Sequence, residues 1–397
     1  MCLISSIATF EATNGPTTHE VLMPGSLSLD VAHAMPETPD ELTPEWLTWA
    51  LASRRPGVTV TAAAVSTIVW GTATKVLMTL DFAPGAPDDL LRSVCVKGGF
   101  DPALREFGLG SSYRREAEFY AHLAPQLDIA LPRVWYSGAD AAGQQGIVVM
   151  EDLAAGGFSF GECTEPMTVD QVASGLDVLA GLHGGTWGAD PGRFPWLTQI
   201  NPVREVGALL LDAPYWDQHF ASEYAPVVPD ELLDRPRMQA AFAAWWRYAE
   251  SDQYVAVSHN DPHIGNTYLA ADGQVSFLDW QAVCAAPAMD DVAYFISGAL
   301  SVEDRRERES ALLAHYLEAL ARHGGPDLNL DDVWDEYRMN LIHGFFWALT
   351  GPQMQRADRV AAMAERHLAA MIDHETVPLL LNRGASEGIA ISPALST

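Results

Sequence analysis

Three oxygen-bearing side chains lie at a spacing that could bind a hard cation. Asp261 and Asn266 follow an apolar, strand-like run, and Asp279 ends a second run that returns after a turn at residues 272–273. A hairpin between Asn266 and Asp279 would bring these side chains together although 13 residues separate them. Mg²⁺ prefers carboxylate and amide oxygens, with waters and phosphates. Phosphoryl transfer uses such a site, because the metal neutralises phosphate oxygens while a carboxylate orients the attacking hydroxyl.

Lysine is rare in the chain, which has two lysines, Lys75 and Lys97, against 21 arginines. Lys97 ends an apolar strand-like run and is a candidate phosphate contact. Lys75 has no partner motif around it and is expected to be a surface residue. Gly71 and Thr72 lie in a turn that carries a single glycine, and backbone N–H groups and threonine hydroxyls of such a turn can cradle an anion.

The elements that must position these residues change in type along the chain. A cap at Thr43 followed by proline predicts a first helix, and strands are expected over 58–65, 75–82 and 92–97. A helix over 112–123 and strands over 133–136 and 146–150 follow. After a glycine-bearing connection at 151–157 the chain is expected to be mainly helical to about residue 380, apart from the hairpin after His259. This order predicts an α+β fold with two lobes.

The catalytic candidates form a recognisable pattern. His259-x-Asp261-x-x-x-x-Asn266, followed by Asp279-Trp280, resembles the catalytic loop and metal-binding motif of the aminoglycoside phosphotransferase and choline kinase superfamily. The segment from Asp279 to Phe295, which contains Pro287-x-x-Asp290-Asp291-x-x-Tyr294, is similar to its ecdysteroid-kinase-like (CHK kinase-like) subgroup. Further short motifs at 96–97, 115–120 and 148–153 extend the resemblance over roughly residues 55 to 300. Each motif is weak alone, and their common order is what makes the resemblance specific.

The resemblance implies a protein-kinase-like two-lobed fold, with an antiparallel-sheet N-lobe and a mainly helical C-lobe. It implies that Asp261 is the catalytic base or hydroxyl-orienting residue, and that His259 is a structural member of the catalytic loop. It also implies that Asn266 and Asp279 are magnesium ligands. Asn260 departs from the family pattern, since relatives usually carry glycine there.

The resemblance further implies that ATP is the cofactor bound by the first lobe. Lys97 would contact its α- and β-phosphates and be held by an ion pair from Glu116, for which Glu118 is a rival two positions along the helix. Gly71 and Thr72 would cover the phosphates. The adenine edge would lie against the backbone from about 149 to 153, which contains Met150, Glu151 and Leu153.

The expected organisation has four parts. Residues 1–25 are expected to be a flexible tail, 26–152 the nucleotide-binding N-lobe, 153–385 the helical C-lobe with catalytic loop and acceptor pocket, and 386–397 a second tail.

The charge balance excludes some partners. A formal charge of −29 and a sequence pI near 4.5 disfavour nucleic acid and anionic membranes, which require basic patches. The basic run at 305–308 alternates with acidic residues and is expected to be a solvated helix face. Four cysteines without a CxxC pair, no signal peptide and no long apolar stretch predict a soluble cytoplasmic protein.

Other functions stay open. A metal-dependent hydrolase would use His259, Asp261 and His263 as ligands, although no second cluster completes such a site. A non-catalytic pseudokinase would keep the fold as a binding module. A protein kinase is disfavoured because little chain follows Asp279 for a peptide groove. The acceptor is equally open: the aromatic-rich C-lobe favours a bulky sterol-like or polyketide-like alcohol, and the acidic surface favours a cationic aminoglycoside or choline-like substrate.

Overall fold

The computed structural model describes residues 34–87, 90, 92–140, 142, 144–189, 193–197, 202–250 and 255–386. The predicted tails lie outside these residues, except for Ser386. The chain divides into two compact units. The first comprises residues 1–125 and 132–156, and the second comprises 126–131 and 157–397.

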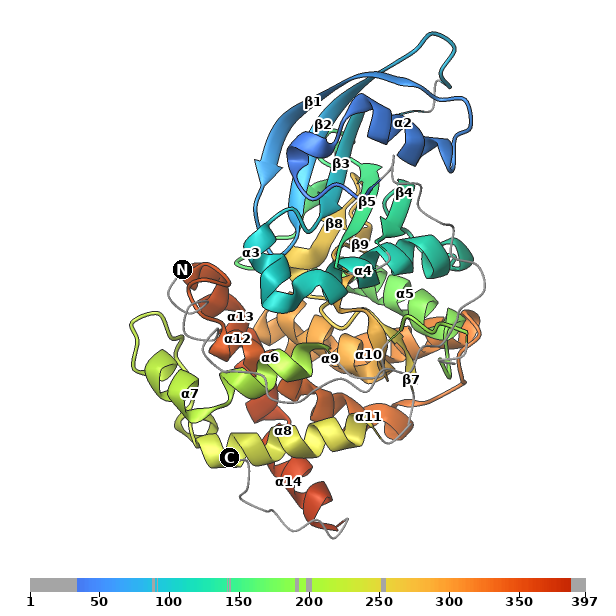
Figure 1. Cartoon of the computed structure of the whole chain (residues 1–397). Coiled ribbons are helices and arrows are strands. Elements are labelled where there is room, and N and C mark those ends of the chain that lie inside the picture. The colour runs from blue at the N-terminus through green and yellow to red at the C-terminus, as the bar shows by residue number, and fades with distance from the viewer. Residues whose placement is uncertain are drawn as a thin grey trace. The chain divides into compact units, whose positions relative to one another are not determined.

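The first unit is built on a five-stranded antiparallel sheet with strand order β1-β2-β3-β5-β4 (Figure 1). Its strands are β1 (Val60–Val69), β2 (Thr74–Phe82), β3 (Ser93–Gly98), β4 (Val134–Ala139) and β5 (Gly146–Glu151). Its helices are α2 (Pro44–Ala52), α3 (Pro102–Leu104) and α4 (Gly110–Glu118), and α4 continues as a π-helical turn over Phe119–Leu123. The strands and helices predicted for this part of the chain are confirmed, with shifts of a few residues at their ends.

One face of this sheet packs on α2. The helix begins where predicted, because the Thr43 side chain accepts a hydrogen bond from the backbone N–H of Trp46 and proline occupies the first turn. Trp46 and Leu47 of α2 join Val76 and Val96 in one buried core cluster. Because side chains alternate along a strand, the neighbours of Val76 and Val96 belong to the other face.

The second unit is mainly helical, as expected. Its helices are α5 (Val169–Gly185), α6 (Pro202–Leu210), α7 (Ala213–Phe220), α8 (Arg235–Ala249), α9 (Ala288–Ala299), α10 (Val302–Arg322), α11 (Leu330–Asn340), α12 (Phe346–Leu349), α13 (Ala357–Asp373) and α14 (Thr376–Ser386). Its strands are β6 (Ser159–Phe160), β7 (Val255–Ser258), β8 (Thr267–Leu269), β9 (Val275–Phe277) and β10 (Cys284–Pro287). None of the helices in the described part of the chain is long and apolar enough to cross a bilayer.

Two small sheets support the loop at residues 259–266. The predicted hairpin is confirmed, because β8 pairs antiparallel with β9 and Thr267 lies opposite Phe277. A second pair, β7 with β10, was not predicted. The loop that carries Asp261 therefore begins at the end of β7 and ends at the start of β8.

The expectation of a solvated helix face at 305–308 is wrong at Arg305. This side chain is 1% exposed and forms ion pairs with Glu309, one turn along α10, and with Asp373 of α13. Arg306 and Arg308 are exposed, as expected. The alternation of charges along the helix does not reveal that Arg305 faces the carboxylate of Asp373, which lies far away in the sequence.

Candidate active site

In the first unit, Lys97 and Glu116 form a buried ion pair. The Lys97 ammonium lies 2.8 Å from each carboxylate oxygen of Glu116, and both side chains are 4% exposed. The rival Glu118 instead pairs with Arg114 and His122 on the helix surface. The helix that carries Glu116 can approach the sheet closely because Gly146 has no side chain: a Cβ there would lie 2.2 Å from the carbonyl oxygen of Tyr113.

Gly71 and Thr72 lie in the turn that joins β1 to β2, directly before Lys75 on β2. The Tyr113 hydroxyl of α4 donates a 2.7 Å hydrogen bond to the Thr72 carbonyl. The turn is thus tied to the helix that positions Glu116. No close contact at Gly71 requires glycine, since a Cβ would meet only the Ala73 carbonyl at 3.5 Å.

Met150 and Glu151 end β5, and Leu153 follows in the connection out of the sheet. All three are buried. The Glu151 carboxylate is already engaged, because it accepts from the backbone N–H of Arg133 at 2.7 Å and pairs with the Arg133 side chain at 3.3 Å. Any contact of residue 151 with a ligand would therefore come from its backbone.

In the second unit, one buried carboxylate holds the start of the loop at residues 259–266. Asp291 of α9 accepts hydrogen bonds of 2.7 Å from the backbone N–H groups of both His259 and Asn260. It also contacts His183 at 3.0 Å. The sequence reasoning noted the Asp290-Asp291 pair only as part of a motif, and the structural role of Asp291 was missed. The signal in the sequence that could have revealed this role is the pair of adjacent aspartates, Asp290 and Asp291, that follows Pro287.

Two residues of this region adopt left-handed backbone conformations. Asn260 and Asp279 both have φ of 66°. Asparagine and aspartate tolerate this region better than other non-glycine residues, so Asn260 can take the place of the glycine that relatives usually carry. Strained backbone of this kind clusters at functional sites.

The hairpin brings the three predicted oxygen ligands into one neighbourhood. The Asn266 amide donates to the Asp261 carbonyl at 2.9 Å and to its carboxylate at 3.1 Å, which leaves the amide oxygen as an acceptor. The backbone N–H of Leu278, directly before Asp279, donates to the Asn266 carbonyl at 2.7 Å. The Asp279 charge acts on Asp261 and helps to raise its pKa.

The Asp261 side chain combines partial exposure with a raised pKa. Its side chain is 39% exposed, so a small molecule can reach it. Enough protein nonetheless surrounds the carboxylate for desolvation to raise the pKa of Asp261 to about 7. The Tyr294 hydroxyl, which accepts a 2.8 Å hydrogen bond from the Trp347 indole, lies 3.5 Å from the Asp261 carboxylate.

His259 is fully buried and bonded through both ring nitrogens. Its Nε2 donates to the Leu278 carbonyl at 2.8 Å, and its Nδ1 accepts from the backbone N–H of Asp261 at 3.3 Å. It therefore ties the two arms of the site together and has no nitrogen to offer a metal. Across the described ranges, no group of three or more His, Cys, Asp or Glu side chains could hold a metal ion.

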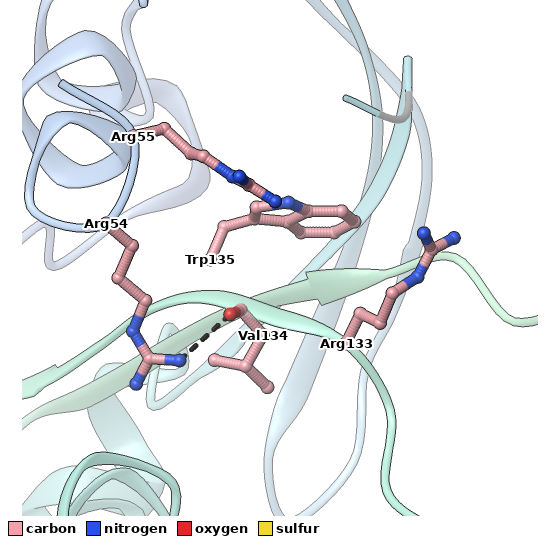
Figure 2. A pocket seen from close by; sticks show the side chains of 5 residues that line it. All are labelled: Arg54, Arg55, Arg133, Val134 and Trp135. Atoms are coloured by element: carbon pink, nitrogen blue, oxygen red, sulfur yellow. Dashed lines mark hydrogen bonds between the residues drawn. The ribbon is translucent and has the colours of Figure 1, made fainter. Parts of the chain in front are cut away.

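A separate hollow in the first unit contains none of the predicted site residues. It has a volume of about 330 Å³ and is lined by Arg54, Arg55, Arg133, Val134 and Trp135. Figure 2 shows Arg54 reaching the Val134 carbonyl, at 2.9 Å, while Arg55 extends along the Trp135 indole. Arg133 pairs with Glu151. Arg54 and Arg133 therefore already donate to protein groups at this hollow.

The buried ion pair leads to a stability prediction. Glu116→Gln is expected to lower the free energy of unfolding by about 3–5 kcal/mol, because the buried Lys97 charge loses its compensating carboxylate. Glu118→Gln, on the same helix, is the matched control and should cost at most about 1 kcal/mol, as for an exposed pair. Urea denaturation measures both. Equal losses in the two variants would contradict a special role for the Lys97–Glu116 pair.

The comparisons with known proteins identify the family. A family model described as "Phosphotransferase enzyme family" matches residues 104–338, which is more than half of the chain. The chain therefore belongs to this phosphotransferase family, and the relationship predicted from the motifs is confirmed at that level. The matched range contains Glu116, Asp261, Asn266 and Asp279 and begins after Lys97. The predicted α+β organisation is confirmed, with one unit built on an antiparallel sheet and one mainly helical unit.

Solved structures of small-molecule kinases are similar at low identity. Macrolide 2'-phosphotransferase MphH from Brachybacterium faecium is 17% identical, with a TM-score of 0.39, over 80% of this chain and 96% of that one. Choline kinase from Cryptosporidium parvum Iowa II is 12% identical, with a TM-score of 0.45, over 88% and 98%. The GDP complex of wild-type aminoglycoside 2'-phosphotransferase-IIIa is 10% identical, with a TM-score of 0.43, over 87% and 99%. No curated protein sequence matches the chain. These likenesses do not bear on the substrate.

Proposed function

We propose that the chain transfers the γ-phosphate of ATP to a hydroxyl group of a small molecule and that it requires Mg²⁺. The observation that carries this proposal is the hairpin that gathers Asp261, Asn266 and Asp279 beside one another. Family membership supports the class of reaction. The identity of the nucleotide and the roles of the residues are inferred from their chemistry.

The donor set fits a magnesium ion. The Asn266 amide oxygen and the Asp279 carboxylate are hard oxygen ligands, and a site with two protein ligands leaves positions for phosphate oxygens and water. Bound magnesium would neutralise the charge of the phosphate oxygens. Two hydrogen bonds hold Asn266 and Asp279 close to each other. The His259 ring bonds to the Leu278 carbonyl, and the Leu278 backbone N–H donates to the Asn266 carbonyl.

Asp261 would orient the acceptor hydroxyl and accept its proton at the carboxylate. A pKa of about 7 suits a general base, because proton transfer is most efficient when the pKa lies near the working pH. The Asn266 bond and the nearby Tyr294 hydroxyl fix the direction of the carboxylate.

Lys97 would contact the α- and β-phosphates of ATP while Glu116 holds it in place. The turn that contains Gly71 and Thr72 would cover the phosphates with backbone N–H groups. The backbone of Met150, Glu151 and Leu153 would bind the adenine edge. All of these residues belong to the first unit, as a nucleotide-binding lobe requires.

The acceptor is proposed to be a bulky, partly apolar alcohol. The aromatic-rich second unit favours such a molecule, although the aromatic side chains nearest Asp261 are buried: Tyr294 stacks on His343 and His367, and Trp347 donates to the Tyr294 hydroxyl. An antibiotic, a choline-like cation and a sterol-like alcohol all remain candidates, and membership of the ecdysteroid-kinase-like subgroup remains a prediction. The hydrolase hypothesis is weakened because both His259 nitrogens are engaged.

An ATP-consumption screen tests this function. Purified protein is incubated with Mg·ATP and a panel of hydroxylated metabolites, sterols, aminoglycosides and macrolides, and ADP release is measured. We expect one chemical class to stimulate ADP release, and mass spectrometry should show a phosphate ester of that compound. Nucleotide binding without turnover on any acceptor would favour the pseudokinase. Tightly held zinc in the purified protein would favour the hydrolase.

A further inference from the structure

The two lysines of the chain lie directly opposite each other on neighbouring strands. Lys75 of β2 is the register partner of Lys97 of β3 in the antiparallel sheet. Directly opposed residues in such a pair project to the same face. The next pair, Val76 and Val96, projects to the α2 face and is fully buried in the core cluster. Both lysines therefore belong to the face that Glu116 approaches.

The environment of Cys95 supports this placement. Cys95 lies two residues before Lys97 and so shares its face. Burial raises the pKa of the Cys95 thiol to about 11, while the charges of both Lys75 and Lys97 act to lower it. The Lys75 ammonium is therefore close enough to this face to act on a thiol within it.

The two lysines differ in how their charge is balanced. Lys97 is neutralised by both oxygens of Glu116. Lys75 is half-buried, and among the residues that the structure describes no carboxylate lies within ion-pair distance of its ammonium. Like charges directly opposite each other across two strands destabilise a sheet. The charges of Glu116 and Asp152 also act on the Cys95 thiol. Neither carboxylate is paired with Lys75, so among the described residues the Lys75 charge has no direct ion-pair partner on this face.

The remaining members of this face are mainly apolar. In the β2, β3 and β5 registers they include Leu77, Cys95, Val148 and Met150, of which all but Leu77 are buried. The lysines and the turn at 70–73 lie toward one end of this face. We infer that Lys75 is a second phosphate-binding cation of the nucleotide site, acting beside Lys97. This inference rests on the proposed function, and it replaces the expectation of a surface role for Lys75.

Isothermal titration calorimetry tests this inference with Mg·ATP and adenosine as ligands. We compare the wild-type protein with Lys75→Gln, Lys75→Arg and the control Arg92→Gln, which removes an exposed arginine paired with Asp81 in the same sheet. Lys75→Gln should weaken Mg·ATP binding about ten- to one-hundredfold, the range for losing a charge-assisted hydrogen bond. Adenosine affinity should stay unchanged, Lys75→Arg should retain most of the ATP affinity, and Arg92→Gln should match the wild type.

The outcomes separate this inference from the proposed function. Wild-type protein that binds no Mg·ATP would overturn the proposed function and the inference together. Wild-type binding with equal affinity in Lys75→Gln would overturn the inference and leave the function standing. Equal weakening of ATP and adenosine in Lys75→Gln would show a disturbed sheet and would also overturn the phosphate role.

Discussion

Replacing Asp261 with alanine is expected to lower phosphoryl-transfer turnover by about 10²–10⁴, the range for losing a positioned acid–base group. The acceptor hydroxyl would lose both the carboxylate that aligns it and the group that accepts its proton. Mg·ATP affinity should change little, because Lys97 and the first unit are untouched. Steady-state kinetics with the acceptor found by screening measures the turnover, and calorimetry measures ATP binding.

A neighbouring variant controls for general disturbance of the loop. His263→Gln alters a residue two positions away. The native His263 Nδ1 accepts the backbone N–H of Gly265 at 3.0 Å and lies 3.9 Å from the Cys163 thiol, and its Nε2 lies 3.8 Å from the Asp261 carboxylate. We expect it to retain turnover within about tenfold of the wild type, since the Asp261 carboxylate proposed to accept the proton is kept. Near-normal turnover in Asp261→Ala would refute the role of Asp261. Loss of turnover in His263→Gln as large as that in Asp261→Ala would point to a histidine-based site.

The pH dependence provides a second check on Asp261. Desolvation raises its pKa to about 7 in the ligand-free protein. The basic form is the active one, so turnover should fall as the pH drops through this pKa. A bound divalent cation stabilises the carboxylate and lowers its pKa, so the acidic limb in the working complex should lie below about 7. A profile that rises toward acidic pH would contradict the assignment.

Asp279→Ala is expected to abolish magnesium-dependent nucleotide binding. This carboxylate is the only charged ligand proposed for the metal besides the phosphates themselves, and Mg²⁺ binds through few protein carboxylates. Calorimetry with ATP in the presence and absence of Mg²⁺ measures the effect. The wild type should bind more tightly with Mg²⁺, and the variant should show no difference between the two conditions.

The control for Asp279 lies in the same hairpin. Asp272 stands in the turn between β8 and β9, where its carboxylate accepts the backbone N–H of Gln274 at 3.1 Å. Asp272→Ala removes an equal charge from the same hairpin and should leave the magnesium effect intact. An unchanged Mg·ATP affinity in Asp279→Ala, or an equal loss in Asp272→Ala, would count against the metal role.

Sequence reasoning succeeded where local signals determine the structure. The cap at Thr43 and the turn at 272–273 produced the expected helix and hairpin. The order of strand-like and helix-like segments along the sequence also predicted a strand-rich first part and a helical second part. The proximity of residues 261, 266 and 279 could be predicted from the sequence because a single hairpin connects them.

Features that depend on distant partners were not visible. Arg305 sits in a charged run, yet its partner Asp373 comes from a helix 68 residues away. The strand β10 contains two alanines and a proline, which have low β-propensity, and it forms only because β7 lies beside it. The opposition of Lys75 and Lys97 depends on the register between β2 and β3, which the sequence reasoning did not predict.

A crystal structure with Mn²⁺ and a non-hydrolysable ATP analogue tests the central claim most directly. Manganese takes the same oxygen ligands as magnesium and is located by its anomalous scattering. We expect an anomalous peak at bonding distance from both the Asn266 amide oxygen and the Asp279 carboxylate, in contact with the phosphates and with Asp261 close by. A peak bound to His263, or a nucleotide whose metal contacts neither residue 266 nor residue 279, would contradict the account.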